Sequence, residues 1–488
     1  MACLKAERRH TMIVDQLALR IVCLSIVTLS HSSAVGRTTE IGRKPDAVQQ
    51  WGAFNPDTLL FTAAETGDPE GVKAALAAGA QINAKNDNGF TPLMLAAKSS
   101  SNPEVITTLI NAGAGIKAKH ENRWTPLMLG VQSNPNPEVI IALINSGAQV
   151  HSKDEFGWTP LMLAAKSNPN PEVITALISA GAHVNAKDED SYTPLMAAAR
   201  NPNPGVVVAM IRSGAEVGAK DGSGWTPLMS AARLNPNPEV ITTLIRAGAE
   251  VNAKSVMGRT PLLFAGGNPN PEVFIALINA GAEVNARDNL GGTPLMSAAW
   301  LNPNPEVITT LIRAGAEINA RNEYGWTPLI VAAWHQHNPE VITTLINAGA
   351  EINARDKDGG TPLMLAARYN SDPEMVAALI NAGAEIDARD ESGYTALMRA
   401  SHSNSTPVVI TALVNAGAEV NARDSNDRTP LMHAARNSSN PEVVMALLAH
   451  GSDAKLKDAT GQTALGYAKD NEALKGTEAF WKLNDASF

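Results

Sequence analysis

The chain has 488 residues, of which only 4% are aromatic and 18% are charged, and its formal net charge is −9. So few aromatic side chains favour many small cores in series over one large core. The acidic balance disfavours nucleic acid as a partner, because the protein would repel a phosphate backbone. Both cysteines, Cys3 and Cys23, lie within the first 34 residues. The rest of the chain therefore has no cysteine for a disulfide or a thiolate metal site.

The N-terminal segment is typical of a secretory signal peptide. Arg8 and Arg9 precede an apolar run that is cleanest over 21–29, and the small residues at 32–34 offer a cleavage site. The run is too short for a membrane-spanning helix, which takes about 20 apolar residues. Lipid attachment at Cys23 is disfavoured, because no small residue directly precedes it.

We therefore expect residues 1–34 to be a signal peptide and residues 35–55 to be a linker. On this interpretation the protein is exported, either to the periplasm or out of the cell. Arg20 interrupts the start of the apolar run, and translation that begins at Met12 would shorten the basic segment to a usual length. If the leader is not a signal peptide, the chain would stay in the cytoplasm.

From residue 56 onward the sequence repeats itself every 33 or 34 residues, which is the mark of a repeat array. Each unit opens with Thr, usually followed by Pro-Leu-Met. The thirteen copies open at Thr58 (a degenerate copy), Thr91, Thr125, Thr159, Thr193, Thr226, Thr260, Thr293, Thr327, Thr361, Thr395, Thr429 and Thr463. Twelve copies cover residues 56–462, and residues 463–488 form a more charged last copy that we expect to cap the array.

One unit, which opens at Thr159, predicts two short helices. Pro160 suits a first helical turn, and the apolar residues of 161–165 have helical spacing. Asn170 then precedes Pro and Glu, which is an N-cap followed by a favourable first turn. The second helix carries an apolar stripe over 173–178, and Gly181 ends it in a left-handed conformation.

A polar, turn-rich segment over 184–192 completes the unit and predicts a loop that projects from the helix pair. Neither helix could bury its apolar face alone, so neighbouring copies must stack to form the core. The sequence therefore predicts an all-α solenoid of helix–turn–helix units with β-hairpin-like loops. The frequent alanines would let thin layers approach closely.

The consensus resembles the ankyrin repeat: T-P-L-M-x-A-A, then V-I-x-x-L-x-x-x-G-A-x-V-N-A-K/R-D. Tetratricopeptide repeats have a similar period, but no copy shows their W-x2-L-G-x2-Y pattern. Two departures from the ankyrin pattern recur. An Asn-Pro-Asn-Pro turn between the helices is longer than usual and would explain the 34-residue spacing, with copies at Thr58, Thr193 and Thr260 lacking the extra residue. The family's His after Thr-Pro-Leu is replaced in most copies by Met, which we expect to fill the core: Met94, Met128, Met162, Met196, Met229, Met296, Met364, Met398 and Met432.

No motif for phosphate binding, nucleophilic catalysis, dinucleotide binding or zinc hydrolysis occurs in any copy. His335 and His337 are the only close histidine pair outside the leader, and their spacing fits a metal poorly. We therefore expect no catalytic residues, no metal and no cofactor.

The resemblance implies that a partner would bind at the loop tips and at the first-helix surface, on the concave side. Two variable columns stand out there. The residue before each repeat Thr is aromatic in seven of twelve copies, and a second column follows the Ala-Ala pair. Exposed Trp, Tyr and Arg are frequent interface hot spots. The predicted partner-binding residues are Trp124, Trp158, Trp225, Arg233, Trp300, Trp326, Trp334 and Tyr369.

A structural explanation competes with binding for the column before Thr, because an aromatic ring there could pack on the neighbouring loop. For Trp300, Trp334 and Tyr369 binding is favoured, since most copies have polar residues at those positions. Trp481 in the last copy is expected to pack beneath the cap.

The leading hypothesis is a non-catalytic scaffold that acts as a monomer and binds a protein partner, with neither nucleic acid nor a membrane span involved. Two alternatives stay open. The chain could stabilise or tether an envelope enzyme, or it could be a secreted effector that engages host proteins.

Overall fold

The computed structural model describes residues 55–370, 372–403 and 406–487. The predicted signal peptide and nearly all of the predicted linker lie outside these residues. The described part consists of helices and loops without strands, which confirms the all-α solenoid. None of its helices is long and apolar enough to cross a membrane.

The helices form thirteen pairs within the described residues, and each pair is one repeat. The first helices are α2 (Pro56–Thr66), α4 (Pro92–Ser99), α6 (Pro126–Ser133), α8 (Pro160–Ser167), α10 (Pro194–Ala198), α12 (Pro227–Leu234), α14 (Pro261–Phe264), α16 (Pro294–Leu301), α18 (Pro328–His335), α20 (Pro362–Tyr369), α22 (Ala396–Ser403), α24 (Pro430–Asn437) and α26 (Ala464–Ala468). The second helices are α3 (Pro69–Ala77), α5 (Pro103–Asn111), α7 (Pro137–Asn145), α9 (Pro171–Ser179), α11 (Pro204–Arg212), α13 (Pro238–Arg246), α15 (Pro271–Asn279), α17 (Pro305–Arg313), α19 (Pro339–Asn347), α21 (Pro373–Asn381), α23 (Pro407–Asn415), α25 (Pro441–Ala449) and α27 (Glu478–Ala486).

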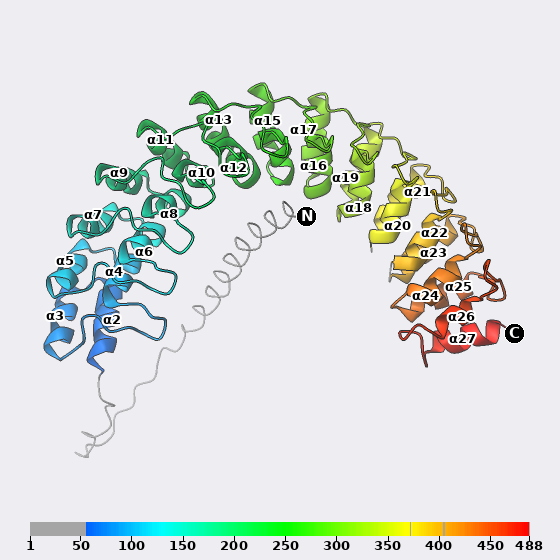
Figure 1. The fold of residues 1–488 in the computed structure, drawn as a ribbon, viewed down its shortest axis with the longest axis horizontal. Coiled ribbons are helices and arrows are strands. Elements are labelled where there is room, and N and C mark those ends of the chain that lie inside the picture. The colour runs from blue at the N-terminus through cyan, green and yellow to red at the C-terminus, as the bar shows by residue number, and fades with distance from the viewer. Residues whose placement is uncertain (1–54, 371, 404–405, 488) are drawn as a thin grey trace, which may run out of the picture. The chain divides into compact units, whose positions relative to one another are not determined.

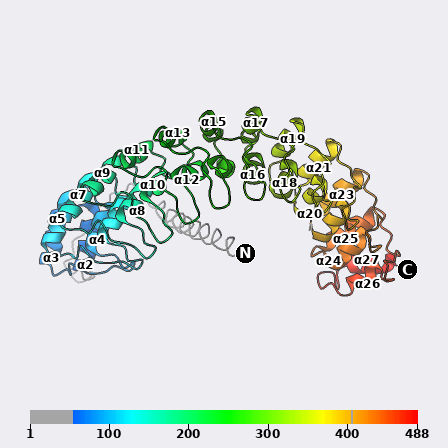
Figure 2. The same cartoon turned by 45° about the horizontal axis from the view of Figure 1, so that its top comes forward.

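The pairs stack in chain order. First helices pack on the first helices of neighbouring repeats and second helices on second helices, so that each set forms a row (Figures 1 and 2). In the unit that opens at Thr159, the buried face comprises Leu161, Ala164 and Ala165 on α8, with Val173 and Leu177 on α9. These faces join one continuous apolar core through the stack, because each repeat covers its neighbour.

The capping residues behave as the sequence predicts. The Thr159 hydroxyl accepts a hydrogen bond from the Met162 N–H at 3.3 Å, and the Asn170 side chain accepts one from the Glu172 N–H at 2.9 Å. Gly181 has a φ of 94°, the left-handed conformation expected at a helix end. The methionine column is buried, which confirms core filling. In three copies, at Met94, Met229 and Met432, its sulfur also accepts a hydrogen bond from the repeat Thr N–H.

The explanation of the 33-residue copies was wrong for those at Thr193 and Thr260. Their Asn-Pro-Asn-Pro turns are intact, and the missing residue comes from the end of the first helix. Helix α10 has only 5 residues, and α14 has 4 followed by a 3-10 turn over Ala265–Gly267, whereas α8 has 8. The turn is kept because its asparagines have partners in the preceding repeat.

The first Asn of each Asn-Pro-Asn-Pro turn is buried and forms a ladder along the stack. The Asn235 amide donates to the Ala199 carbonyl at 2.9 Å and to the Asn201 carbonyl at 2.7 Å, both in the preceding repeat. Its oxygen accepts from the Asn237 N–H at 3.0 Å. The same arrangement recurs at Asn134, Asn168, Asn201, Asn268 and Asn302, and the Gln336 side chain makes the equivalent two donations.

Two further ladders run parallel to the first. The second Asn of the turn caps its helix and also donates to a carbonyl one repeat back, as from Asn237 to Pro202 at 2.9 Å. In most repeats an Asn after the second helix reaches forward, as Asn319 donates to the Gly349 carbonyl at 3.1 Å and accepts from the Glu351 N–H at 2.8 Å. Most repeat boundaries in the described part of the chain are thus held by side-chain amides as well as by apolar contacts.

The projecting loops are tight turns, most of them organised by an Asp or Asn. In one of them the Asp188 carboxylate accepts from the Asp190 and Tyr192 N–H groups, and the Asp188 N–H donates to the Tyr192 carbonyl at 3.2 Å. Toward the C-terminus, adjacent loops are joined by a backbone hydrogen bond, for example from the Lys357 N–H to the Tyr324 carbonyl at 3.0 Å.

The last repeat ends in α27, whose Ala479 and Leu483 are buried. The expectation that Trp481 packs beneath this cap was wrong, because its side chain is 58% exposed. Phe480, next to it in sequence, packs against the core instead. The two rings stand edge to face, so α27 presents one of two adjacent aromatic residues to the core and the other to solvent.

We predict that Asn235→Ala lowers the free energy of unfolding by about 2–3 kcal/mol, because two buried carbonyls lose their donor. Urea denaturation followed by circular dichroism measures this loss. Asn279→Ala is the matched control, since that asparagine is exposed at the end of α15 and should change stability by less than about 0.5 kcal/mol. Equal effects of the two replacements would contradict a structural role for the ladder.

Candidate functional site

The predicted partner-binding residues lie at two places on the first-helix side of the stack. Four half-buried tryptophans each directly precede the Thr that caps a first helix: Trp124, Trp158, Trp225 and Trp326. Trp300, Trp334 and Tyr369 lie at the C-terminal ends of α16, α18 and α20, and Arg233 occupies the equivalent place on α12. The two sets differ in their surroundings.

The tryptophans before the repeat Thr tie neighbouring loops together. The Trp124 indole hydrogen-bonds the Asp154 carboxylate of the next loop, and Trp326 does the same for Asp356. Burial raises the pKa of both carboxyls despite these hydrogen bonds, which act in the opposite direction. The structural explanation therefore holds for this part of the column, although the rings stay partly open to solvent.

Cationic side chains from the first helices lie over several rings of this column. The Lys166 ammonium is 5.3 Å from the centre of the Trp158 ring, and the Arg233 guanidinium is 5.3 Å from the centre of the Trp225 ring. Such cation–π contacts contribute about 0.5–1 kcal/mol at exposed sites. They also hold the cations in place beside the ends of the first helices.

Trp300, Trp334, His335 and Tyr369 form one connected group, which we call the aromatic band. The centre of the Trp334 ring lies 6.0 Å from that of Trp300 and 5.7 Å from that of Tyr369. His335 stacks on Trp300 with ring centres 4.6 Å apart. Three predicted residues from three consecutive repeats are thus brought together, as the sequence suggested.

The aromatic band is open to solvent. Trp300 is 43% exposed and Tyr369 is 45% exposed, and Leu301, which follows Trp300 in α16, is 58% exposed. Trp334 is more buried, because Trp326 meets it edge to face with ring centres 4.8 Å apart. Trp326 therefore packs against Trp334 of the band and also interacts with Asp356 of the next loop.

Sequence reasoning missed two residues of this surface. Tyr324 at the loop tip is 47% exposed and contacts Trp326 with ring centres 5.2 Å apart. His335 was considered only as a metal ligand, yet it is part of the aromatic stack. Burial lowers its pKa, and the charge of His337 acts in the same direction. The spacing Tyr-x-Trp before the repeat Thr was the available signal for Tyr324.

Comparison with known proteins identifies the repeat family to which the stacked helix pairs belong. The family described as ankyrin repeats (3 copies) matches overlapping stretches that together run from residue 38 to 424, and the family described as ankyrin repeats (many copies) matches residues 413–468. The chain belongs to the ankyrin repeat family. Ankyrin repeats generally mediate protein–protein interactions, and the proteins that contain them are typically non-catalytic scaffolds.

Among solved structures, the crystal structure of the human ASB11 ankyrin repeat domain is similar to part of the chain. The identity is 24%, the alignment covers 46% of this chain and 98% of that one, and the TM-score is 0.41. The comparison with curated proteins gives no match.

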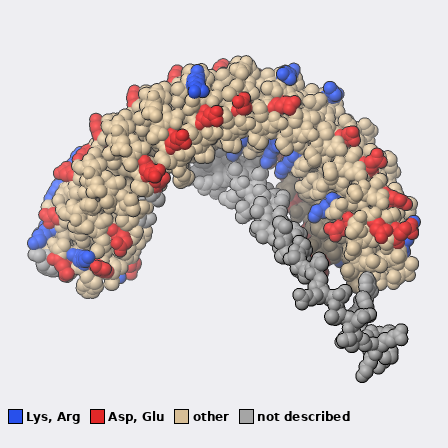
Figure 3. Space-filling model, turned by 180° about the vertical axis from the view of Figure 1, so that it is seen from behind, with Lys and Arg blue, Asp and Glu red and all other residues tan. Residues whose placement is uncertain are grey.

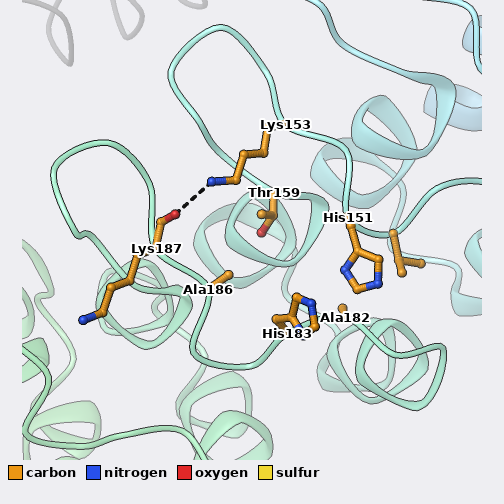
Figure 4. Close-up of a pocket in the computed structure, with 8 residues that line it drawn as sticks. His151, Lys153, Thr159, Ala182, His183, Ala186 and Lys187 are labelled. Carbon is orange, nitrogen blue, oxygen red and sulfur yellow. Dashed lines mark hydrogen bonds between the residues drawn. The ribbon is translucent and has the colours of Figure 1, made fainter.

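The ankyrin array has a small cavity of about 220 Å³ at the base of two adjacent loops (Figure 4). His151 lies there in place of the Asn that elsewhere reaches the next repeat, and its ring packs on His183 with centres 4.5 Å apart. The Lys153 ammonium donates to the Lys187 carbonyl at 3.1 Å. The cavity therefore marks a gap in one amide ladder. No group of three or more potential metal ligands occurs in the described part of the chain.

In the last repeats of the array, polar side chains of the first helices pair with buried carboxylates of the loops. Arg399 pairs with Asp390, His433 lies 3.0 Å from the Asp424 carboxylate, and the Tyr467 hydroxyl donates to Asp458 at 2.5 Å. Burial lowers the pKa of His433 to about 4, and it outweighs Asp424, which acts in the opposite direction.

We predict that His433 makes the array less stable as the pH falls from about 6.5 to 4. The pKa in the folded chain lies below the unfolded value of about 6.5, so the unfolded chain binds more protons in this window. The contribution is complete above about pH 6.5, and its loss amounts to about 3 kcal/mol by pH 4. Urea denaturation at several pH values should show this component in the wild type and not in His433→Gln. His337→Gln, at an exposed histidine, should keep the wild-type pH dependence, and a His433→Gln variant that also kept it would refute the assignment.

Proposed function

We propose that this ankyrin array is a non-catalytic scaffold that binds a partner protein through the aromatic band. The observation that carries the proposal is the exposure of Trp300 and Leu301 on α16 and of Tyr369 on α20, with the Trp334 ring of the intervening α18 in contact with both Trp300 and Tyr369. Trp and Tyr are the side chains most enriched in interface hot spots. Contiguous exposed apolar surface on a soluble protein commonly marks a site of interaction.

The fold does not require apolar residues at these positions. In other repeats the last residue of the first helix is an exposed Ser, as at Ser99, Ser133, Ser167 and Ser403. The same place carries Leu301 on α16 and Tyr369 on α20. Since the helix forms equally well with Ser, the apolar side chains serve something other than the stability of the stack.

The proposal narrows the predicted binding residues. Trp300, Trp334 and Tyr369 form the contact surface, together with Tyr324 and Leu301. Trp124, Trp158, Trp225 and Trp326 primarily hold the loops and present only their outer edges. Arg233 lies over Trp225, two repeats before the start of the band, and adds positive charge there.

We further propose that the partner is met outside the cytoplasm, which rests only on the signal-peptide character of residues 1–34. Tethering of an envelope enzyme and engagement of host proteins are two forms that such binding could take. Identification of the bound protein, followed by fractionation of the native host, would distinguish them.

We predict that Trp300→Ala combined with Tyr369→Ala weakens partner binding by at least tenfold and leaves the fold intact, since both side chains are largely exposed. The partner is identified by affinity purification from the native host with mass spectrometry, and the purified protein is then titrated against wild type and variant by calorimetry. Trp481→Ala is the matched control, because it removes an exposed Trp outside the band. Unchanged affinity of the double variant would refute the site, whereas equal melting temperatures would confirm that any loss comes from the surface.

A further inference from the structure

Charge is unevenly distributed over the repeats. The seventh residue after each repeat Thr lies at or near the end of the first helix, and we call this set the seventh-residue column. In the eleven internal repeats it comprises Lys98, Gln132, Lys166, Arg200, Arg233, Gly267, Trp300, Trp334, Arg368, His402 and Arg436. None of these is acidic, although the chain has 48 acidic and 39 basic residues. Acidic residues occupy the position only in the first and last repeats, at Glu65 and Asp470.

Acidic side chains gather elsewhere on the repeats. Most second helices carry a Glu in their first turn, where it interacts favourably with the positive end of the helix. These are Glu70, Glu104, Glu138, Glu172, Glu239, Glu272, Glu306, Glu340, Glu374, Glu442 and Glu478. Figure 3 shows acidic groups spread over the repeats on one face of the molecule. The first-helix ends are therefore positive within an acidic protein.

Like charges crowd one another along the seventh-residue column. Burial lowers the pKa of Lys166 to about 8, and the nearby charge of Arg200 acts in the same direction. Burial also lowers the pKa of His402, and the positive charges of Arg368, Arg399 and Arg436 lower it further. Among the described residues, no ion pair joins Lys166, Arg200, Arg368 or Arg436 to a carboxylate. An anionic partner would relieve this repulsion.

The order of residues along the column indicates which parts of such a partner would be charged or apolar, and how long an extended partner segment would be. Lys166, Arg200 and Arg233 come from three consecutive repeats, the two tryptophans of the aromatic band follow after one gap, and Arg368, His402 and Arg436 come next. Each repeat is about 10 Å thick, one helix diameter. An extended chain advances about 3.3 Å per residue, so about three of its residues match one repeat.

We propose that the first-helix surface binds an extended acidic segment of a partner protein, with its apolar centre on the aromatic band and its carboxylates facing the cationic members of the seventh-residue column on either side. The inference rests on the proposed function of the band and adds the chemistry of the ligand. The nine repeats from Lys166 to Arg436 would accommodate about 27 residues, with acidic side chains at about every third position.

The test uses the full chain and a fluorescein-labelled peptide of about 27 residues. The peptide carries Glu at every third position in its outer thirds, Leu and Phe in its central third, and Ser or Gly elsewhere. A second peptide has Gln in place of each Glu. In fluorescence anisotropy titrations the Glu peptide should bind at least tenfold more tightly than the Gln peptide at low salt, and added salt should reduce the difference. Equal affinity for the two peptides would overturn the proposal.

A charge variant locates the interaction. Lys166→Gln, Arg200→Gln, Arg368→Gln and Arg436→Gln together should weaken binding of the Glu peptide by at least tenfold. The matched control removes four exposed cations outside the column, through Arg212→Gln, Arg246→Gln, Arg313→Gln and Lys469→Gln. A loss as large in the control would overturn the assignment to the column. Should the first variant lose its cooperative melting, Arg436→Gln alone, at an exposed position within the nine repeats, tests the same charge effect.

Two further arms separate this inference from its alternatives. A labelled single-stranded oligothymidylate that binds more tightly than the Glu peptide and displaces it would identify the ligand as nucleic acid and overturn the proposal. With the purified partner, loss of binding in Trp300→Ala/Tyr369→Ala but not in the charge variant would keep the aromatic band and overturn the acidic ligand. Loss in the charge variant alone would support the acidic ligand and refute the band.

Discussion

The buried amide between the two helices of most repeats controls how the stack is built. Asn168 carries a side-chain N–H group into the interior, where an unpaired donor costs about 1–3 kcal/mol. Its acceptors are the carbonyls of Val131 and Asn134, which are available only when the preceding repeat lies at the right distance and angle. Where this amide is present, one side chain therefore fixes the position of a whole repeat, and small alanines can then fill the contact. The shortened helices α10 and α14 show the priority of this constraint, because they lose a residue from the helix and keep the turn.

Because buried amides and apolar contacts fix the stack, the residues at the ends of the first helices can vary without disturbing it. These positions carry Ser in some repeats, Lys or Arg in others, and Trp or Tyr around α16, α18 and α20. The aromatic band and the cationic members of the seventh-residue column are thus additions to a uniform scaffold. The aromatic residues before each repeat Thr belong partly to the scaffold and partly to the variable surface. An indole such as that of Trp124 interacts with the next loop and is still partly open to solvent.

Local features of this fold could be predicted from the sequence, because their causes lie within one repeat. Asn170 and Gly181 take their capping roles from neighbours a few residues away, and the buried Met162 follows from helical spacing. The ladder was not foreseen, since the acceptors of Asn168 lie 34 and 37 residues back in the chain. The place of Trp481 was misjudged because Phe480 beside it competes for the same core, and only the orientation of α27 decides between them. For the proposed binding surface, the spacing correctly predicted that Trp300, Trp334 and Tyr369 lie close together, whereas the role of Trp326 depends on an interaction with another repeat.

The amides of the inter-helix turns point one way along the chain. Each donates to carbonyls of the repeat before it, from Asn134 near the start to Asn471 in the last repeat. A ribosome releases the N-terminus first, so every newly made repeat meets acceptors that are already in place. The array can then grow by one repeat at a time during synthesis, without waiting for the far end of a 488-residue chain. Circular permutation within the array would preserve most contacts of the finished stack yet reverse the order in which some donors and acceptors emerge.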